Sequence, residues 1–231
     1  MEIKDYVHSR ILQLPQLADS YIKDERNRYY SQRWAFIKLK QLVDDFAIKK
    51  NPDPNRFIVL SGLRGIGKTT LLMQLYNYLI QEVKVSKNNI LYISADEIQS
   101  FLGCSLSQII TSYLEDELKT TAIALQEKVF IFIDEAHYDA KWNATLKALT
   151  DLSKNIFVIA TGSSALLLEI TTDSARRITK EPLFPLSFSE YQILKHEKFY
   201  PPTGMSKNIR DLILNGTQSL IPEINQQYSE L

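Results

Sequence analysis

The alternation of short apolar runs with helix-type patterns between residues 56 and 162 is what most constrains the fold of this chain. The apolar runs occupy residues 56–60, 89–94, 128–134 and 155–162, and the helical patterns between them occupy residues 68–81, 105–119 and 142–153. This order is typical of parallel βαβ units. A run that is apolar at every position, such as "VFIFI" at 129–133, fits a strand covered by helices on both faces. The sequence therefore predicts an α/β fold in which a parallel sheet lies between two layers of helices.

The turn between the first apolar run and the next helical pattern is rich in glycine. Three of the seven glycines of the chain lie between Gly62 and Gly67, directly before Lys68 and Thr69. Together these residues complete the pattern G-x-x-x-x-G-K-[ST], in which backbone N–H groups surround a phosphate and the following helix adds its positive N-terminal end. In such a loop the lysine reaches the β- and γ-phosphates and the hydroxyl is a Mg²⁺ ligand. A glycine-rich turn that holds no ligand is the alternative interpretation.

The sequence thus predicts a set of nucleotide-binding residues in and directly after this loop: Gly62, Leu63, Arg64, Gly65, Ile66, Gly67, Lys68, Thr69 and Thr70. Lys68 is also predicted to act in catalysis, and Thr69 to bind the metal. The variable position of Arg64 favours an outward-facing side chain.

An acidic pair ends the third apolar run, in "VFIFIDEAH". A carboxylate at the end of a parallel strand lies at the carboxyl edge of the sheet, where open α/β folds bind their ligands. Asp134 is therefore predicted to hold Mg²⁺, and Glu135 to polarise the attacking water as a general base. His137 follows closely and is interpreted as a positioning or packing residue. The alternative is that Asp134 and Glu135 cap a helix on a solvated face.

A hydroxyl-rich turn ends the fourth apolar run, and an arginine pair follows it. Ser163, with Thr161 as second choice, is predicted to lie beside the Asp134 strand within reach of the γ-phosphate. Capping of the next helix by Ser163 or Ser164 is an equally good local interpretation. Arg176 and Arg177 are candidates for phosphate-sensing arginines acting in cis or from a neighbouring subunit. The alternative for them is a solvated face or a salt bridge.

Composition limits the partners of the chain. Its 27 basic and 27 acidic residues cancel, so no whole-molecule field attracts nucleic acid or an anionic membrane. The apolar runs are far shorter than the roughly 20 residues of a membrane span, and the N-terminus lacks the pattern of a secretory signal. We therefore expect a cytoplasmic protein. Arginines alternate with aromatic residues in "RNRYY" and "SQRW", which leaves a stacking surface for nucleic acid open, although packing is the simpler interpretation.

The ordered motifs resemble those of a prokaryotic family of predicted AAA+ ATPases, whose core is usually followed by a separate C-terminal domain of unknown function. The motifs are "GLRGIGKTTLL", "YISADE", "VFIFIDEAHYDAKWNATLKALTD", "IFVIATGSSALLL" and "PLFPLSFSEY". The resemblance implies that Lys68 and Thr69 belong to Walker A, that Asp134 and Glu135 are the Walker B pair, and that Ser163 is the sensor residue. It also implies a P-loop sandwich with a parallel sheet of about five strands in the order 5-1-4-3-2.

The chain departs from this family in two respects. Family members commonly carry Gly-Arg before the "PLSF" segment, whereas this chain reads "SARRITKEPLFPLSF". The chain also ends at Leu231, where family members continue into a lid and a C-terminal domain. We therefore expect an N-terminal extension at 1–32, an ATPase core at 33–195, and a partial lid or tail at 196–231 without the C-terminal domain.

These observations favour an ATP-binding and ATP-hydrolysing molecular switch with ATP and Mg²⁺ as its ligands. A nucleotide-gated protein-interaction module with little turnover remains an alternative, as does a small-molecule phosphotransferase. The acidic pair favours water over an acceptor alcohol as the nucleophile. Self-association or a protein partner is compatible with the sequence.

Overall fold

The computed structural model describes residues 2–48, 55–163, 166, 170 and 175–196. The chain divides into two compact units, Met1–Pro185 and Leu186–Leu231. In the second unit, α8 (Phe188–His196) begins with a reciprocal cap. The Glu190 N–H donates to Ser187 Oγ at 3.2 Å, and the Ser187 N–H donates to Glu190 Oε2 at 3.2 Å. This is the capping-box arrangement that satisfies N–H groups at a helix start.

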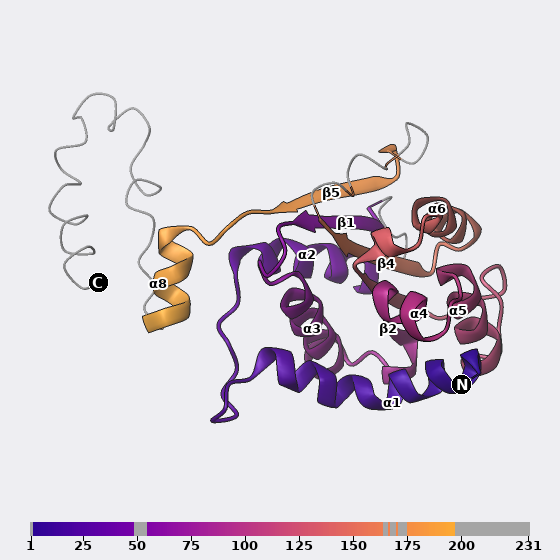
Figure 1. The fold of residues 1–231 in the computed structure, drawn as a ribbon, viewed down its shortest axis with the longest axis horizontal. Helices are drawn as coiled ribbons and strands as arrows, with labels where there is room; N and C mark the ends of the chain where they lie inside the picture. The colour runs from indigo at the N-terminus through magenta and orange to yellow at the C-terminus, as the bar shows by residue number, and fades with distance from the viewer. Residues whose placement is uncertain (1, 49–54, 164–165, 167–169, 171–174, 197–231) are drawn as a thin grey trace, which may run out of the picture. The chain divides into compact units, whose positions relative to one another are not determined.

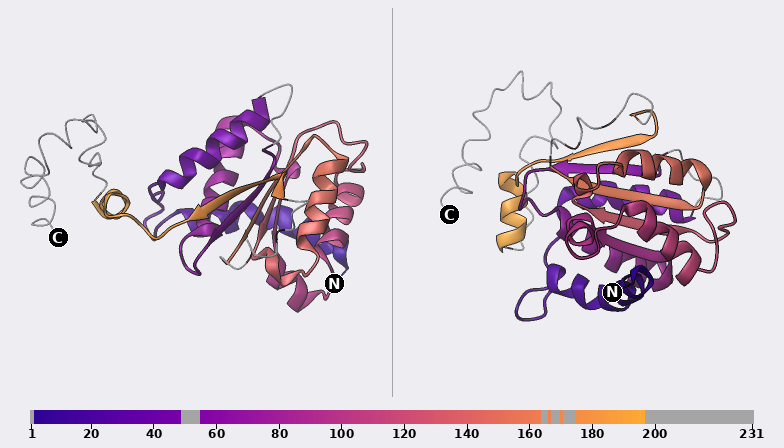
Figure 2. Two further views of the ribbon diagram at one scale, coloured as in Figure 1. Left: turned by 90° about the horizontal axis from the view of Figure 1, so that it is seen from above. Right: turned by 45° about the vertical axis from the view of Figure 1, so that its right-hand side comes forward.

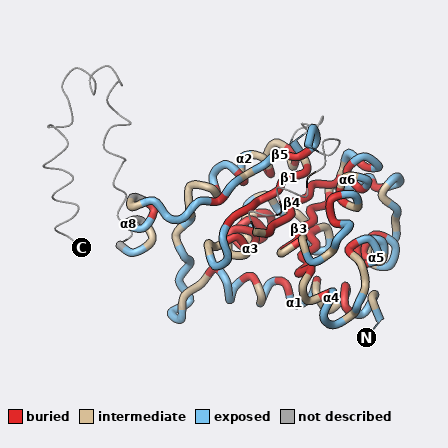
Figure 3. The backbone as a smooth tube through the Cα atoms, turned by 45° about the horizontal axis from the view of Figure 1, so that its top comes forward, coloured by how far each residue is buried: buried red, intermediate tan, exposed pale blue. Residues whose placement is uncertain are grey.

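The first unit is built on a five-stranded parallel sheet in the order β2-β3-β4-β1-β5 (Figure 1). The strands are β1 (Phe57–Gly62), β2 (Ile90–Ser94), β3 (Val129–Asp134), β4 (Ile156–Gly162) and β5 (Ile178–Leu183). Every residue of the first four strands is buried, as the continuous red of the central strands in Figure 3 illustrates. The predicted α/β fold and strand order are confirmed.

Helices cover both faces of the sheet, as the turned views of Figure 2 show. Among the described residues of the first unit, the α-helices are α1 (Ile3–Ile22), α2 (Trp34–Ile48), α3 (Lys68–Tyr78), α4 (Ala95–Phe101), α5 (Leu106–Ser112) and α6 (Trp142–Leu152). Short π- and 3₁₀-helical segments are η1 (Leu79–Val83), η2 (Lys87–Asn89), η3 (Tyr113–Glu117) and η4 (Ala136–Tyr138). Among the described residues, no helix has both the length and the apolar character that a membrane crossing requires.

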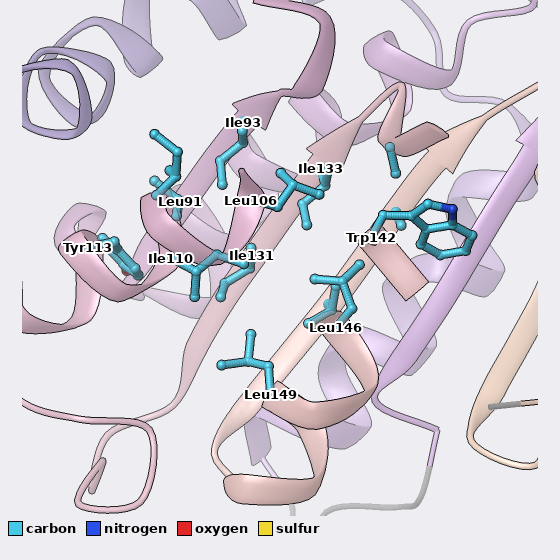
Figure 4. Packing of buried hydrophobic residues seen from close by; sticks show 14 of the residues in the cluster. Leu91, Ile93, Leu106, Ile110, Tyr113, Ile131, Ile133, Trp142, Leu146 and Leu149 are labelled. Atoms are coloured by element: carbon cyan, nitrogen blue, oxygen red, sulfur yellow. The ribbon is translucent and has the colours of Figure 1, made fainter. Parts of the chain in front are cut away.

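The pleat of the strands separates two hydrophobic clusters. In β3, Ile131 and Ile133 contribute to the cluster under α5 and α6, while Phe130 and Phe132 contribute to the cluster under α2 and α3. Figure 4 shows the first cluster, with Leu146 and Leu149 of α6 and Ile110 of α5 facing the strand residues. Successive side chains of a strand point to opposite faces, which explains why β3 is apolar at every position from Val129 to Ile133.

Helix α1 belongs to the folded core, although the sequence analysis placed residues 1–32 outside it. Its buried apolar residues recur at helical spacing and join both clusters. Tyr6, Val7 and Ile11, in the first half of the helix, belong to the cluster under α5 and α6. Leu14, Ala18 and Ile22, in the second half, belong to the cluster under α2 and α3. The helix contacts α3, α5 and the edge strand β2 (Figure 1). An edge strand exposes unpaired N–H and C=O groups, and a covering helix shields them. The compact unit Met1–Pro185 therefore includes α1, while an ATPase core with the bounds 33–195 stays an expectation.

We expect Leu14→Ala to lower the free energy of unfolding by about 2–5 kcal/mol, the usual cost of a cavity left by a fully buried leucine. Leu14 is 0% exposed, whereas Leu12 on the same helix is 54% exposed. Leu12→Ala is therefore the matched control and should change stability by less than about 0.5 kcal/mol. Urea unfolding of both variants measures the difference. Equal small effects would contradict the placement of α1 in the core.

Candidate functional site

The candidate site lies at the carboxyl edge of the central strands. The strand register places the end of β1 beside the end of β4, with Leu60 opposite Thr161, and the end of β3 beside the end of β2, with Ser94 opposite Asp134. Because all strands are parallel, the turns that follow them meet at one edge. The glycine loop, the acidic pair and the Ser163 turn are therefore neighbours in space although they are far apart in the sequence.

The glycine loop depends on its glycines for two different reasons. Gly65 and Gly67 have φ values of +76° and +97°, in the left-handed region that side chains disfavour. Gly62 is required for a different reason, since a Cβ there would come within 2.7 Å of the Leu183 carbonyl oxygen. Helix α3 begins at Lys68, and its N-cap Gly67 has no side chain to occupy the first-turn N–H groups. These N–H groups remain available to an anion.

The Lys68 side chain occupies the mouth of this loop. It is 5% exposed, and its Nζ donates to the carbonyl oxygens of Gly62 and Leu63, each at 3.2 Å. Glu135 Oε1 lies 3.6 Å from Nζ. A buried ammonium needs such partners to offset its desolvation, and here it lines the cleft beside the loop.

Asp134 accepts hydrogen bonds from three hydroxyl groups. Thr69 donates to Oδ2 at 2.5 Å, Tyr92 donates to Oδ2 at 3.2 Å, and Thr161 donates to Oδ1. Burial and the Asp134 carboxylate raise the pKa of the Tyr92 hydroxyl well above its usual range, so this hydroxyl stays protonated and donates. A hydroxyl beside a carboxylate is a donor set that Mg²⁺ accepts when phosphate oxygens and waters complete its shell. Thr69 and Asp134 therefore fit the metal predicted for them.

Glu135 directly follows β3 and is the N-cap of η4. Its φ and ψ are 50° and 45°, a left-handed conformation that is uncommon for a residue with a side chain and often marks a functional site. The Glu135 N–H donates to Thr161 Oγ1 at 3.2 Å. Its carboxylate lies between Lys68 and His137, whose Nδ1 is 3.5 Å from Oε2. Thr161 thus holds both members of the acidic pair.

A cleft of about 200 Å³ opens beside these groups. It is lined by Arg64, Lys68, Asp96, Glu135, His137, Tyr138 and Ser163. The structure therefore brings Ser163 to the same cleft as Lys68 and Glu135. Thr161, the second choice of the sequence analysis, is fully buried and contacts Asp134. Ser163 therefore has access to the cleft, whereas Thr161 organises its acidic wall.

The remaining loop residues are placed as follows. Leu63 and Arg64 are exposed, and Ile66 and Thr70 are partly buried. Tyr92, in the middle of β2, and Asp96, in the first turn of α4, lie in the "YISADE" motif but had no predicted role. Once β2 is placed beside β3, residues at its carboxyl end are expected to reach Asp134, so the predicted strand order contained the signal.

The arginine pair lies at the other edge of the sheet. Arg176 and Arg177 directly precede β5, whose first residue Ile178 pairs with Phe57 at the start of β1. Arg177 forms an ion pair with Asp151 in the last turn of α6. The glycine loop follows the opposite end of β1, so the structure does not bring either arginine to the site of its own chain. This corrects the role in cis that the sequence analysis allowed, and a contribution from a second copy stays a prediction.

The family described as an AAA domain matches residues 54–192. The chain belongs to this family. The matched range contains the glycine loop, the acidic pair and the Ser163 turn, which are the groups assembled at the carboxyl edge of the sheet.

Two relatives and one solved structure are similar to this AAA domain. It is 36% identical over 214 residues to the uncharacterized protein MJ1637 of Methanocaldococcus jannaschii, covering 90% of this chain and 42% of that protein. It is 32% identical over 135 residues to an uncharacterized protein of Haemophilus influenzae, covering 58% of this chain and 32% of that protein. The Aeropyrum pernix ORC1 protein, solved in complex with DNA, matches with 14% identity and a TM-score of 0.50, covering 76% and 52% of the two chains. This last likeness shows the fold alone.

The AAA domain chain thus spans less than half the length of the two curated relatives, 42% and 32% respectively. What the family match establishes is the nucleotide-binding type of fold.

Proposed function

We propose that this AAA domain binds Mg-ATP and hydrolyses the bond between the β- and γ-phosphates, working as a nucleotide-driven switch. One observation carries the proposal: Lys68 and Glu135 meet at 3.6 Å, and Thr69 and Asp134 meet at 2.5 Å, at the mouth of one glycine loop. Phosphoryl transfer depends on positioning and charge neutralisation more than on covalent chemistry. A cation, a base and a metal-binding pair at one loop are the parts that this reaction needs.

Each residue has a role that follows from its position. The loop N–H groups and Lys68 bind and orient the phosphates. Thr69 and Asp134 would hold Mg²⁺, which would neutralise charge on the β- and γ-phosphate oxygens. Glu135 accepts a proton from the attacking water. Ser163, which lines the same cleft, donates its hydroxyl to the γ-phosphate or to that water. The ion pair between Lys68 and Glu135 supports a nucleotide-free state in which the two charges neutralise each other. When a nucleotide binds, its phosphates replace Glu135 as the partner of the lysine.

The proposal is tested on the purified chain by two measurements, ATP binding and Mg²⁺-dependent release of inorganic phosphate. Binding with turnover supports the proposal. Binding without turnover, with and without DNA, would favour a nucleotide-gated interaction module instead. Absence of ATP binding in the presence of Mg²⁺ would overturn both functions.

We expect Tyr92→Phe to raise the Mg²⁺ concentration required for half-maximal phosphate release about twofold to tenfold, because one hydrogen bond is worth about 0.5–1.5 kcal/mol. Without the Tyr92 hydroxyl, the Asp134 carboxylate loses a buried donor that holds it toward Thr69. Tyr113→Phe is the matched control, since the Tyr113 hydroxyl is bonded to the Asn88 carbonyl at 2.6 Å. An equal shift in both variants would contradict a local role of Tyr92.

A further inference from the structure

Arg33 joins three segments that are distant in the sequence. It directly precedes α2, and its Nη1 donates to the carbonyl oxygen of Ile66 at 2.9 Å. Its Nη2 donates to the carbonyl oxygen of Phe184, just after β5, at 2.8 Å. A guanidinium presents several donors in a rigid planar fork, so it can hold two carbonyl groups in a defined relative position. In the sequence Arg33 lies in "SQRW", which the sequence analysis interprets as a surface for nucleic acid or as packing and not as part of the phosphate loop.

The contact with Ile66 fixes the orientation of a peptide unit in the glycine loop. The peptide bond between Ile66 and Gly67 is trans, and in a planar trans peptide the C=O and N–H groups point in opposite directions. When Arg33 holds the Ile66 carbonyl outward, the Gly67 N–H is turned the other way, toward the anion-binding side of the loop. The hydrogen bond to a charged donor also polarises the peptide and strengthens the N–H as a donor.

The contact with Phe184 anchors the arginine to a rigid part of the sheet. The preceding residue, Leu183, is the last of β5 and pairs with Gly62 at the start of the loop. A Cβ on Gly62 would come within 2.7 Å of the Leu183 carbonyl oxygen, so the two backbones are in close contact. Arg33 therefore connects Ile66, late in the loop, to the end of β5. Gly62, the first residue of the loop, pairs with the same end of β5.

We propose that Arg33 is a positioning residue of the phosphate loop, which preorganises the Gly67 N–H for phosphate binding without contacting the nucleotide. This inference rests on the proposed function. It assigns to residue 33 a role in affinity for the phosphate chain itself, independent of the base and the sugar. It also predicts that the arginine acts on all ligands that carry the same phosphates.

The test compares ATP with inorganic tripolyphosphate, which lacks the nucleoside. Both ligands are measured by competition against a fluorescent ATP analogue on wild type, Arg33→Gln and Arg33→Lys. Arg33→Gln is expected to weaken both ligands by the same factor, about tenfold or more, the size of a charge-assisted hydrogen bond. Arg33→Lys retains the charge but not the fork, so it should bind both ligands with intermediate affinity.

Arg26→Gln is the matched control, because Arg26 is an exposed arginine in the same connecting segment. It should bind both ligands as wild type does, and thermal unfolding without ligand should be the same for all variants within a few degrees. Unchanged affinity of Arg33→Gln, or a loss confined to ATP, overturns the inference and leaves the proposed function standing. Wild type that binds neither ATP nor tripolyphosphate overturns both.

Discussion

Glu135→Gln is expected to lower the rate of phosphate release by about 100-fold or more, the usual contribution of a positioned general base. The amide keeps the size of the side chain and tolerates the same left-handed backbone at φ 50°, so the loop should stay in place. It cannot accept the proton of the attacking water. Phosphate release under saturating Mg-ATP measures the loss.

The same variant should bind ATP as tightly as wild type or more tightly. Glu135 Oε1 lies 3.6 Å from Lys68 Nζ. At this distance the carboxylate competes with an incoming phosphate for the ammonium, and its negative charge repels the phosphate. The glutamine removes this competing charge. Retained ATP binding together with lost turnover is therefore the result expected of a general base. Substitution of a residue with only a structural role would lower both ATP affinity and the rate of phosphate release.

Asp96→Asn distinguishes Glu135 from the other carboxylate in the cleft. Asp96 lines the same cleft but accepts a hydrogen bond from Ser94 at the start of α4. If Asp96→Asn reduced turnover more strongly than Glu135→Gln, the assignment of the base to Glu135 would be wrong. A larger effect at Glu135 would support it.

The central part of the fold could be predicted because its signals are local. Strands β1 to β4 are mostly apolar, and helical patterns separate them along the chain, so their type and order can be recognised. Strand β5 has a weaker pattern, since only Ile178 and Leu183 at its ends are buried and Lys180, Glu181 and Pro182 lie between them. Charged residues and proline are what an edge strand tolerates. Its place in the sheet could be expected only from the resemblance to a family.

The parts of the site that could be predicted are likewise those within a motif. Lys68 and Thr69 follow the glycines directly, and Asp134 ends its own strand, so their placement depends on few residues. Tyr92 and Arg33 act on these groups from segments that are distant in the sequence, and their roles depend on which strands are neighbours and how far a side chain reaches. The arginine pair shows the converse, because a residue that precedes a parallel strand lies at the amino edge, away from the loop.

Lys68→Met is expected to lower the affinity for ATP by about 100-fold or more, since the ammonium makes charge-assisted contacts with phosphate that are worth about 1.5–3 kcal/mol each. Methionine fills nearly the same buried space, as Lys68 is only 5% exposed. The carbonyl groups of Gly62 and Leu63 lose a donor, and water can replace it most readily at Leu63, which is exposed. Removal of a buried charge also removes its desolvation cost. The free energy of unfolding should therefore change by no more than about 1–2 kcal/mol.

Isothermal titration with ATP and Mg²⁺ measures the loss, and Lys87→Met is the matched control. Lys87 is exposed and lies in η2, at the amino end of β2, so its removal should leave ATP affinity unchanged.

The double variant Lys68→Met/Glu135→Gln separates two causes of weak binding. If Lys68→Met binds weakly partly because Glu135 is left as an unbalanced negative charge in the cleft, neutralising that charge should recover part of the affinity. If the ammonium contributes only through its own contacts with phosphate, the double variant should bind as weakly as Lys68→Met alone. Retained affinity in Lys68→Met would contradict the placement of the phosphates in this loop.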